Sequence, residues 1–400
     1  MTGAPGAERP GRVPRDDPQR AVLAARVTAL IDLVLAGRRD DDARDALLAD
    51  LCAWQAQHVA PYGRLVAAHE RRATLGSRET LGDWPALPTD VFRMTRVSTY
   101  EEHEDVRVFR TSGTTGGTRG AHAFRDLELY DRAARAAADI ALFPDLGGPP
   151  DPEYAPKMRL VVLAPREEEA PESSLSYMLA RFVEWYGAPG EFGVTYPLSR
   201  GAIDAQVLCA ALDRAVSDGV PTTLLGTSFA FVFADEALGA RRFRLPAGSR
   251  IMQTGGFKGR TRELVPEQMR GLLCARYGVP ESHVVAEYGM TELSSQLYET
   301  TLAAALQGSP DAPRALWIPG WMRAIPVDPE TLKPVPRGEI GVLRLEDPAN
   351  LDSVCMLQTA DLAMEGPSGL VLVGRAAGAV PRGCSLAIEE ALAGHGGRGD

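Results

Sequence analysis

Apolar side chains recur at helical spacing in the first part of the chain. Between residues 21 and 58 they repeat at intervals of three and four positions, and Gly37 interrupts them. This pattern predicts two amphipathic helices separated near that glycine. Residues 1–19 contain mostly Gly, Pro, Arg and Asp with almost no large apolar side chains, so we expect a disordered lead-in there.

From about residue 105, short apolar runs alternate with helical segments. The expected strands are residues 106–110, 158–163, 222–225, 250–253 and 283–286, and the expected helices are residues 130–143, 203–218 and 266–277. This alternation predicts an α/β fold, a layered domain with a substantially parallel sheet. Ligands of such sheets bind at the loops that follow the strands. Residues 339–345 and 369–374 have β character, which predicts a β-rich subdomain near the end.

Composition narrows the class of protein. A chain of 400 residues with 45% hydrophobic content can bury a large core, which excludes general disorder and a disulfide-stapled miniprotein. Acids outnumber bases by 53 to 43, so the net charge of -10 argues against nucleic acid as the main partner. Five scattered cysteines without a CxxC pair disfavour a disulfide framework and a structural zinc site. We see neither a secretion signal nor a bilayer-spanning apolar run, so we expect a cytoplasmic protein.

The strongest chemical signal directly follows the expected strand 106–110. It is a run of glycines and hydroxyl side chains: Thr111, Ser112, Gly113, Thr114, Thr115, Gly116, Gly117, Thr118, Arg119 and Gly120. Glycines let several backbone N–H groups approach one anion, the hydroxyls are further donors, and Arg119 adds a positive charge. The run predicts a phosphate-binding loop, and a Gly/Thr-rich surface turn is the alternative. It lacks the GK[ST] ending of an ordinary P-loop.

Two weaker signals lie further along the chain. The first is the run Glu287, Tyr288, Gly289, Met290, Thr291 and Glu292, just beyond a short apolar strand. A carboxylate and a hydroxyl there could hold a magnesium ion and a phosphate oxygen, and Tyr288 offers a flat face to a base. A capped helix start is the alternative. In the second signal, Asp361 could accept hydrogen bonds from ribose hydroxyls beside Arg375, or the two could form a simple surface ion pair.

The order of these runs resembles the adenylate-forming superfamily of acyl and aryl ligases: TSGTTGGTRG, then EYGMTE, then TADL, then GR. Within that superfamily, the chain is most similar to the acyl-protein synthetase (LuxE) family, the ligase component of the bacterial bioluminescence fatty-acid reductase. The features behind this choice are His122 after the loop, Arg125-Asp126, and residues 170–177, 254–259 and 382–386. The resemblance covers about residues 50–390 and implies the layered large domain of these ligases.

The resemblance also implies a site for ATP and Mg²⁺. Ser112 to Gly117 would bind the β and γ phosphates. The other implied positions are Thr291 and Glu292 for phosphate and magnesium, Tyr288 beside adenine, Gly255 and Gly256 along the adenine and acyl pocket, and Asp361 and Arg375 for ribose. Arg119 stands where the superfamily usually has lysine, and Ala360 stands where a glycine commonly precedes the aspartate.

The C-terminus departs from the superfamily. Typical acyl-CoA ligases continue for a mobile domain of about a hundred residues that carries a catalytic lysine, whereas residues 376–400 contain no lysine. We therefore expect a large domain over 20–374, with its β-rich subdomain at about 315–374, and a hinge with a truncated C-terminal remnant over 375–400. Either another group stabilises the charge that develops during adenylation, or the activity is reduced or lost.

Cys384 and His122 complete the candidate set. In the family the acyl group moves from the adenylate to an enzyme cysteine near the C-terminus, and the RGCSL context of Cys384 resembles that site. Arg382 could favour the reactive thiolate, and a bystander thiol is the alternative. His122 could position the carboxylate or transfer a proton, or it could be a structural donor.

Together these features predict an AMP-forming acid–thiol ligase that acts on a carboxylic acid of the fatty type. The expected partners are the small-molecule acid and a reductase, an acyltransferase or a carrier protein, with neither nucleic acid nor a membrane span. Two alternatives remain open. The acceptor could be coenzyme A or a carrier-protein thiol, or the chain could be a non-catalytic nucleotide-binding partner of a reductase.

Overall fold

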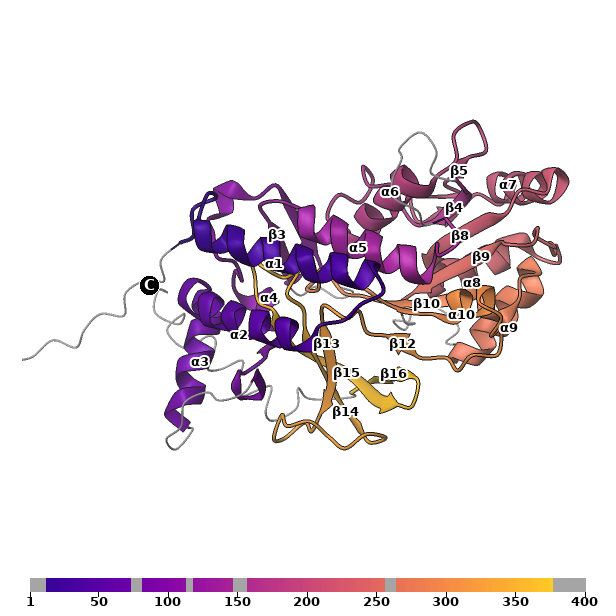
Figure 1. Cartoon of the computed structure of the whole chain (residues 1–400). Helices are drawn as coiled ribbons and strands as arrows, with labels where there is room; N and C mark the ends of the chain where they lie inside the picture. Colours follow the sequence, from indigo (N-terminus) through magenta and orange to yellow (C-terminus); the bar gives the residue numbers. More distant parts are fainter. Residues whose placement is uncertain (1–11, 73–80, 113–117, 147–156, 256–263, 377–400) are drawn as a thin grey trace, which may run out of the picture. The chain divides into compact units, whose positions relative to one another are not determined.

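A computed structural model describes residues 12–72, 81–112, 118–146, 157–255 and 264–376 of the chain (Figure 1). The chain forms two compact units. Unit 1 comprises residues 1–132, 291–294 and 318–400, and unit 2 comprises residues 133–290 and 295–317. The stretch from 20 to 374, expected as one large domain, therefore contains two units whose segments alternate along the chain.

Unit 1 begins with the two helices that the apolar spacing predicts. They are α1 (Pro18–Leu35) and α2 (Asp41–His58), on either side of Gly37. The side chain of Asp40 caps α2 by accepting a hydrogen bond from the backbone N–H of Ala43 at 2.9 Å. The shorter helical elements of this unit are α3 (Ala60–Arg72), α4 (Val91–Met94) and the 3-10 turns Leu81–Asp83 and Glu102–Glu104.

Residues 12–19 are better ordered than the composition of the predicted lead-in over residues 1–19 suggests. Val13 is buried, and its backbone N–H donates to the oxygen of Thr99 at 3.0 Å. The side chain of Asp17 caps α1, which starts at Pro18. One buried valine and one local cap hold these residues in place. The average composition of a polar segment does not reveal such single contacts. Residues 1–11 lie outside the described part of the chain.

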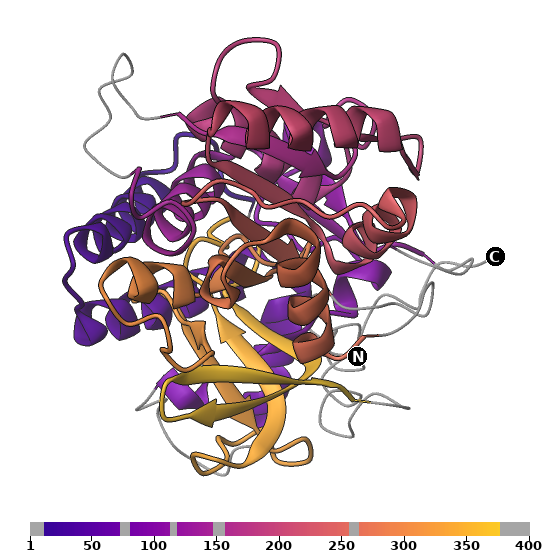
Figure 2. The same ribbon diagram turned by 90° about the vertical axis from the view of Figure 1, so that its right-hand side faces the viewer.

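The long paired strands of unit 1 are antiparallel and come from the end of the described chain. These strands are β13 (Arg323–Val327), β14 (Ile340–Glu346), β15 (Met356–Gly366) and β16 (Gly369–Arg375), in that order. They are the orange to yellow strands in Figure 2. The short β1 (Leu87–Pro88) pairs in parallel with β15. The two β segments predicted near residues 339–345 and 369–374 are confirmed.

Unit 2 is built on a run of paired strands, five of which are parallel. These are β10 (Val284–Tyr288), β9 (Arg250–Thr254), β8 (Thr222–Thr227), β4 (Arg159–Leu163) and β5 (Val194–Thr195), in that order. Antiparallel strands β11 (Leu297–Glu299) and β12 (Leu316–Trp317) follow beyond β10. A separate hairpin joins β6 (Leu198–Ser199) and β7 (Ala202–Ile203). The parallel sheet predicted from the strand and helix alternation is confirmed.

Helices alternate with the strands of this sheet along the chain. They are α5 (Glu128–Ala141), which begins in unit 1, α6 (Ser174–Tyr186), α7 (Ala205–Asp218), α8 (Ser228–Leu238), α9 (Pro266–Tyr277) and α10 (Thr301–Leu306), with a 3-10 turn at Glu281–His283. α9 has the predicted bounds. Pro266 suits the first helical turn, and Gly278 takes the left-handed conformation, at φ 67°, that ends the helix.

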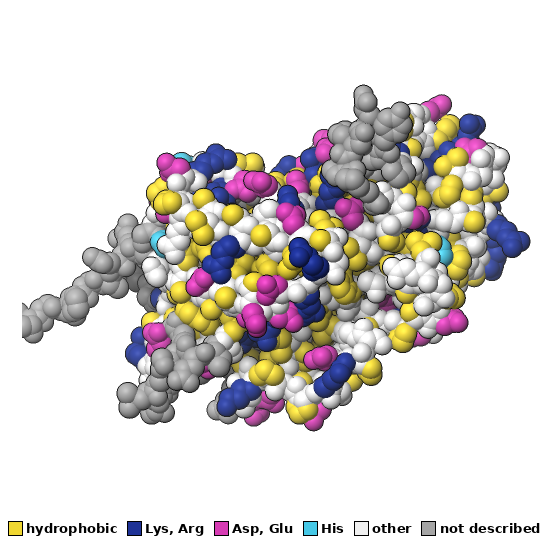
Figure 3. Space-filling view, in the orientation of Figure 1, with side chains coloured by type: hydrophobic (Ala, Val, Ile, Leu, Met, Phe, Trp, Pro, Cys, Tyr) yellow, Lys and Arg dark blue, Asp and Glu magenta, His cyan; other side chains and the backbone are white. Residues whose placement is uncertain are grey.

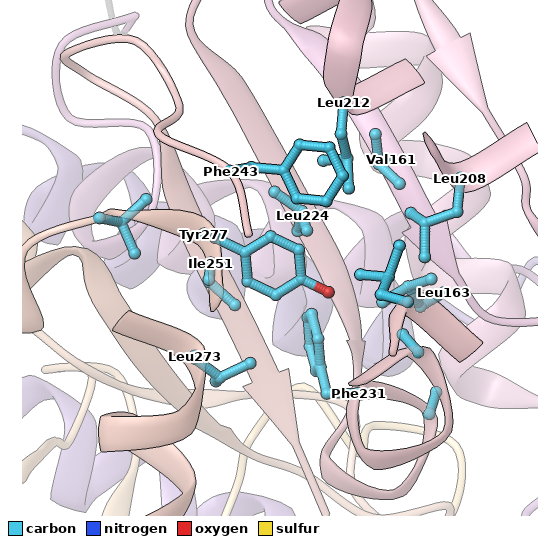
Figure 4. Packing of buried hydrophobic residues seen from close by; sticks show 14 of the residues in the cluster. Val161, Leu163, Leu208, Leu212, Leu224, Phe231, Phe243, Ile251, Leu273 and Tyr277 are labelled. Carbon is cyan, nitrogen blue, oxygen red and sulfur yellow. The ribbon is translucent and has the colours of Figure 1, made fainter. Parts of the chain in front are cut away.

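The core of unit 2 joins the parallel strands to α7, α8 and α9 (Figure 4). Leu163, Leu224 and Ile251, from three neighbouring strands, are fully buried. The helices contribute Leu212, Phe231, Leu273 and Tyr277 to the same cluster. Because helices cover strands of this kind, each strand has a short apolar run at its centre, which is the pattern that identified it in the sequence.

Among the described helices, none combines the length and the apolar character needed to cross a bilayer. Basic and acidic side chains are interspersed on the face of the molecule shown in Figure 3. Many basic and acidic side chains of the described residues form ion pairs, as Arg26 and Asp50 do at 2.6 Å. Exposed pairs of this kind add little to stability, so the fold depends mainly on its buried apolar clusters.

Candidate functional site

The phosphate loop predicted at residues 111–120 connects two paired strands of unit 1. β2 (Arg107–Arg110) and β3 (Ala121–Phe124) are antiparallel. At the base of the loop, the N–H of Thr111 donates to the oxygen of Gly120, and the N–H of Gly120 donates to Oγ1 of Thr111, both at 2.9 Å. These two bonds hold the ends of the loop together. Gly113 to Gly117, the centre of the run, lie outside the described residues.

Arg119 is bonded to the backbone at this loop base. Its Nε donates to the oxygen of Thr111 at 2.7 Å, and its Nη2 donates to the oxygen of Arg110 at 3.2 Å. A planar guanidinium reaches two carbonyls in a way that a lysine ammonium does not, which gives a physical reason for arginine at this position. Both of these acceptors are neutral carbonyls. Ser112 is exposed next to Thr111.

The carboxylate of Glu292 lies against the same loop base. A β-carbon built on Gly120 would stand 3.4 Å from Oε1 of Glu292 and 3.1 Å from Cγ2 of Thr111. Burial raises the pKa of Glu292 to about 7, although a backbone hydrogen bond and the charges of Arg93 and Arg375 lower it. Because burial disfavours the ionised form of this carboxylate, an added cation would stabilise that form. Glu292 therefore fits the magnesium role that the family resemblance implies.

A single carboxylate does not make a metal site by itself. Mg²⁺ prefers octahedral oxygen coordination and is usually bound by one or two carboxylates together with substrate phosphates. Within the described part of the chain, no group of three or more His, Cys, Asp or Glu side chains could hold a metal ion. The position of Glu292 beside the loop therefore suits a metal that arrives with the phosphates.

His122 is buried in unit 1 and uses both ring nitrogens within the protein. Nδ1 lies 2.9 Å from the backbone oxygen of Thr291, and Nε2 lies 2.9 Å from Oγ of Ser353. A carbonyl only accepts, so Nδ1 carries the proton and Nε2 accepts from the Ser353 hydroxyl. Burial lowers the pKa of His122 to about 4, which keeps the ring neutral. With both nitrogens engaged, this geometry does not fit the predicted proton transfer to or from a substrate.

Asp361 and Arg375 face each other across β15 and β16, where they are paired in register. Nε of Arg375 lies 3.8 Å from Oδ1 of Asp361, and the side chains are 63% and 24% exposed, respectively. This ion pair is loose and partly solvated, so it contributes little to stability. Both groups are accessible, as a ribose-binding pair would need to be. The influence of Arg375 on the pKa of Glu292 places the ribose and magnesium candidates of unit 1 within electrostatic range.

The adenine candidates belong to unit 2, at the carboxyl ends of two parallel strands. Glu287 of β10 lies opposite Thr254 of β9, and Oγ1 of Thr254 donates to Oε2 of Glu287. Tyr288 is half-buried at the end of β10, and Gly255 is exposed after β9. This is the sheet edge at which ligands were expected. Gly256 lies outside the described residues.

The carboxyl group of Glu287 is buried and accepts a hydrogen bond from Thr254. Burial raises its pKa to about 7, against the lowering effect of the bond from Thr254. A β-carbon on Gly289 would stand 2.5 Å from Oε1 of Glu287, so the chain passes close to this carboxyl group. Of the two glutamates in the run, Glu292 is therefore the better candidate for a metal ligand.

The structure brings part of the predicted site together. Thr111, Arg119, Glu292 and Arg375 belong to unit 1, and Cys384 lies outside the described residues. Sequence reasoning missed Arg93, whose charge acts on Glu292, because nothing local marks it. It also missed Asn350, whose side chain donates a hydrogen bond to the backbone oxygen of Glu292. This is the only asparagine in the sequence, and that singular use could have drawn attention to it.

Comparison of the sequence with known proteins gives a consistent result. The profile of the family described as acyl-protein synthetase, LuxE, matches residues 38–393. A long-chain-fatty-acid–luciferin-component ligase of Vibrio harveyi is 24% identical over 328 residues, which cover 78% of this chain and 79% of that protein. The ligase of the same name from Aliivibrio fischeri is 23% identical over 290 residues, which cover 71% and 70%.

Solved structures with a similar fold include 2-hydroxyisobutyryl-CoA ligase. Its open conformation with 2-HIB-AMP and CoA has a TM-score of 0.55 at 14% identity, over 83% of this chain and 70% of that chain. Its thioesterification state has a TM-score of 0.56 at 15% identity, over 84% and 68%. At such identities the likeness concerns the fold alone. It confirms the predicted layered α/β fold of adenylate-forming ligases.

Proposed function

The chain belongs to the acyl-protein synthetase (LuxE) family of ligases, and on this basis we propose that it uses ATP to convert a long-chain fatty acid into an acyl-adenylate. The acyl group then passes to a thiol. The fatty substrate is inferred from the two relatives, which are named as long-chain-fatty-acid ligases. A reductase, acyltransferase or carrier protein would receive the acyl group in the next step.

The observation that carries this proposal is the contact of the Glu292 carboxylate with Gly120 at the base of the loop. A phosphate loop needs donors and positive charge, and a phosphate-bound metal needs a carboxylate beside that loop. Arg119 supplies the charge, and the loop ends are held by the reciprocal bonds of Thr111 and Gly120. A Gly/Thr-rich surface turn does not require a buried carboxylate against it.

The chemistry begins with a carboxylate, which is a poor acyl donor. Its oxygen attacks the α phosphorus of ATP, the bond to the β-phosphate oxygen breaks, and pyrophosphate leaves. The loop and Arg119 would hold the β and γ phosphates, and Asp361 would accept bonds from the ribose hydroxyls. The family resemblance assigns adenine to Tyr288. Mg²⁺, when bound at Glu292, would neutralise the phosphate oxygens and make pyrophosphate a better leaving group.

The proposed acceptor is the thiol of Cys384. Its thiolate attacks the acyl carbonyl, the bond between that carbon and the AMP oxygen breaks, and a thioester and AMP result. The proposal rests on the RGCSL context of Cys384 and on Arg382, whose charge favours the thiolate. Of the other cysteines, Cys52 and Cys355 are buried and so are poorly placed for transfer to a partner.

The test is incubation with ATP, Mg²⁺ and a panel of acids, followed by intact-mass measurement. The panel contains saturated fatty acids of increasing length, a short hydroxy acid and an aromatic acid. We expect a long fatty acid to add its acyl mass and hydroxylamine to remove it. Cys384→Ala should abolish the addition. Matched variants at the half-buried thiols, Cys209→Ala and Cys274→Ala, should keep it.

Two results would change this assignment. Acid-dependent pyrophosphate exchange without any acyl mass on the chain, together with thioester formation on added coenzyme A, would move the acceptor off Cys384. Nucleotide binding without pyrophosphate exchange for any acid would overturn the proposal as a whole. That outcome would favour a non-catalytic partner of a reductase.

A further inference from the structure

The segment Thr291–Ser294 is held by buried polar side chains of unit 1. They come from β3 and from the loop between β14 and β15. We call this set the 291 cradle, and its members are His122, Asp347, Asn350 and Ser353. The segment and its cradle all belong to unit 1. The segment includes the phosphate and magnesium candidates, so whatever fixes it also fixes them.

Asn350 makes three side-chain hydrogen bonds in the cradle. Its Nδ2 donates to the backbone oxygen of Glu292 at 2.9 Å and to that of Val354 at 3.1 Å. Its Oδ1 accepts from Oγ of Ser294 at 2.6 Å. The Asn350 amide therefore links the backbone of Glu292 to the loop that contains Asn350 and to the side chain of Ser294.

The other members bind on either side of Glu292. Nδ1 of His122 donates to the oxygen of Thr291, and Oγ of Ser353 donates to Nε2 of His122, which orients the ring. Oδ2 of Asp347 accepts from the backbone N–H of Ser294 at 3.2 Å. The backbone is thus bound immediately before Glu292, at Glu292 and two residues after it.

These bonds are shielded from bulk solvent. His122, Asp347, Asn350 and Ser353 are each at most 2% exposed. A buried carbonyl that loses its donor is left unsatisfied, and the chain shifts to find another partner. A shift of the Glu292 backbone would move its carboxylate away from Gly120.

We propose that Asn350 and His122 are positioning residues that hold Thr291 and Glu292 at the phosphate loop through their backbone oxygens. The inference rests on the proposed function, because the metal concerned arrives with ATP. Neither side chain touches substrate. Their effect is on the geometry of the metal ligand, as partners of metal ligands commonly act.

The first test compares Asn350→Ala with the wild-type chain by two measurements. In the ligand-free protein, hydrogen exchange should be faster in the peptide that contains the Ser294 amide. In equilibrium ATP binding, the variant should need roughly 10-fold or more Mg²⁺ for half-maximal binding. In a Glu292→Gln background the same substitution should add little, since the ligand that it positions is already gone.

Gln55→Ala is the matched control. Gln55 of α2 holds the same loop from another side, because Nε2 donates to the oxygens of Asn350 at 2.9 Å and Leu351 at 3.0 Å. It also accepts from the N–H of Cys355 at 2.9 Å. It makes none of the bonds to Thr291–Ser294 described above. We expect Gln55→Ala to lower stability and to leave the Mg²⁺ requirement unchanged.

A second pair of variants separates positioning from folding. In His122→Asn the amide nitrogen replaces Nδ1 and can still donate to Thr291, whereas in His122→Gln the amide group replaces Nε2 and reaches Ser353 instead. Both variants lose one bond. Positioning predicts that the Asn variant keeps the Mg²⁺ requirement of the wild type and that the Gln variant raises it.

The inference is overturned if folded Asn350→Ala and His122→Gln retain the wild-type Mg²⁺ requirement, or if Gln55→Ala shifts it equally at equal loss of stability. Should Asn350→Ala fail to fold, the His122 pair decides. If the wild-type chain binds no ATP, the proposed function is wrong. The exchange measurement still decides in that case whether the cradle holds the segment.

Discussion

Gly120 lies directly against the carboxylate of Glu292. The site of a β-carbon on this glycine is 3.4 Å from Oε1 of Glu292 and 3.4 Å from Cγ of Arg93. The contact brings a residue of the TSGTTGGTRG run to one of the EYGMTE run, far apart in the sequence. It makes Gly120 a sensitive position for the geometry of the proposed metal and phosphate site.

We expect Gly120→Ala to impair acid-dependent pyrophosphate exchange by about tenfold or more, because the added methyl crowds Cγ2 of Thr111 at 3.1 Å and shifts the base of the loop beside Glu292. Overpacking should also lower the free energy of unfolding by about 1–3 kcal/mol. Exchange kinetics and urea unfolding measure the two effects. Gly271→Ala in α9 is the control, since a β-carbon there meets nothing within 4 Å. It should stabilise the helix and leave exchange intact. Wild-type exchange in Gly120→Ala would contradict the contact.

Asp361→Ala should weaken ATP binding or adenylation about 10- to 100-fold, because one lost ribose contact costs on the order of 1.5–3 kcal/mol. Loss of the ion pair with Arg375 should cost little stability, since that pair is loose at 3.8 Å. The measurement is the apparent ATP constant in pyrophosphate exchange. An unchanged constant would show that Asp361 does not bind ribose.

Arg119→Lys should lower the free energy of unfolding by about 1 kcal/mol, because a lysine cannot reproduce both backbone bonds to Arg110 and Thr111. Urea unfolding at neutral pH measures this loss. The ATP constant should change less than in Arg119→Ala, since lysine keeps the charge. Equal ATP constants for the two variants would mean that this charge does not act on the phosphates.

The pH dependence of stability should report the burial of Glu287. Its pKa in the folded chain is raised from 4.5 to about 7, so the folded state holds this proton more tightly than the unfolded state. The contribution of Glu287 to stability is therefore fully present below pH 4.5 and is lost as pH rises through 7, by up to about 3 kcal/mol. Glu287→Gln removes this dependence.

The measurement is urea unfolding of both proteins at pH 5 and pH 8. At pH 5, where Glu287 is neutral in the folded chain, the two proteins should have similar free energies of unfolding. At pH 8 the free energy of unfolding of the Gln variant should be higher relative to that of the wild type. All other groups titrate in both proteins, so the difference isolates Glu287. A difference that does not vary with pH would rule out the raised pKa.

Much of the architecture follows from local patterns. Helix 266–277 was predictable because Pro266 and Gly278 mark its ends and the apolar spacing fills it. The buried strand at 158–163 was predictable because a strand covered on both faces carries an unbroken apolar run, here residues 160–163. The order of residues 12–19 was not, since it depends on Val13 binding to Thr99, a partner distant in the sequence.

The sequence by itself determined which chemistry this protein can carry: a glycine and hydroxyl loop, a carboxylate run and an aspartate–arginine pair, because each is a contiguous or closely spaced motif with its own donors and acceptors. The tertiary structure alone decided how they are used. It directed the ring of His122 to the backbone of Thr291, bonded Arg119 to the backbone oxygen of Thr111, and bonded Asn350 to the backbone oxygen of Glu292. Hydrogen-bond partners of buried side chains are chosen by packing between distant segments, and no local pattern records that choice.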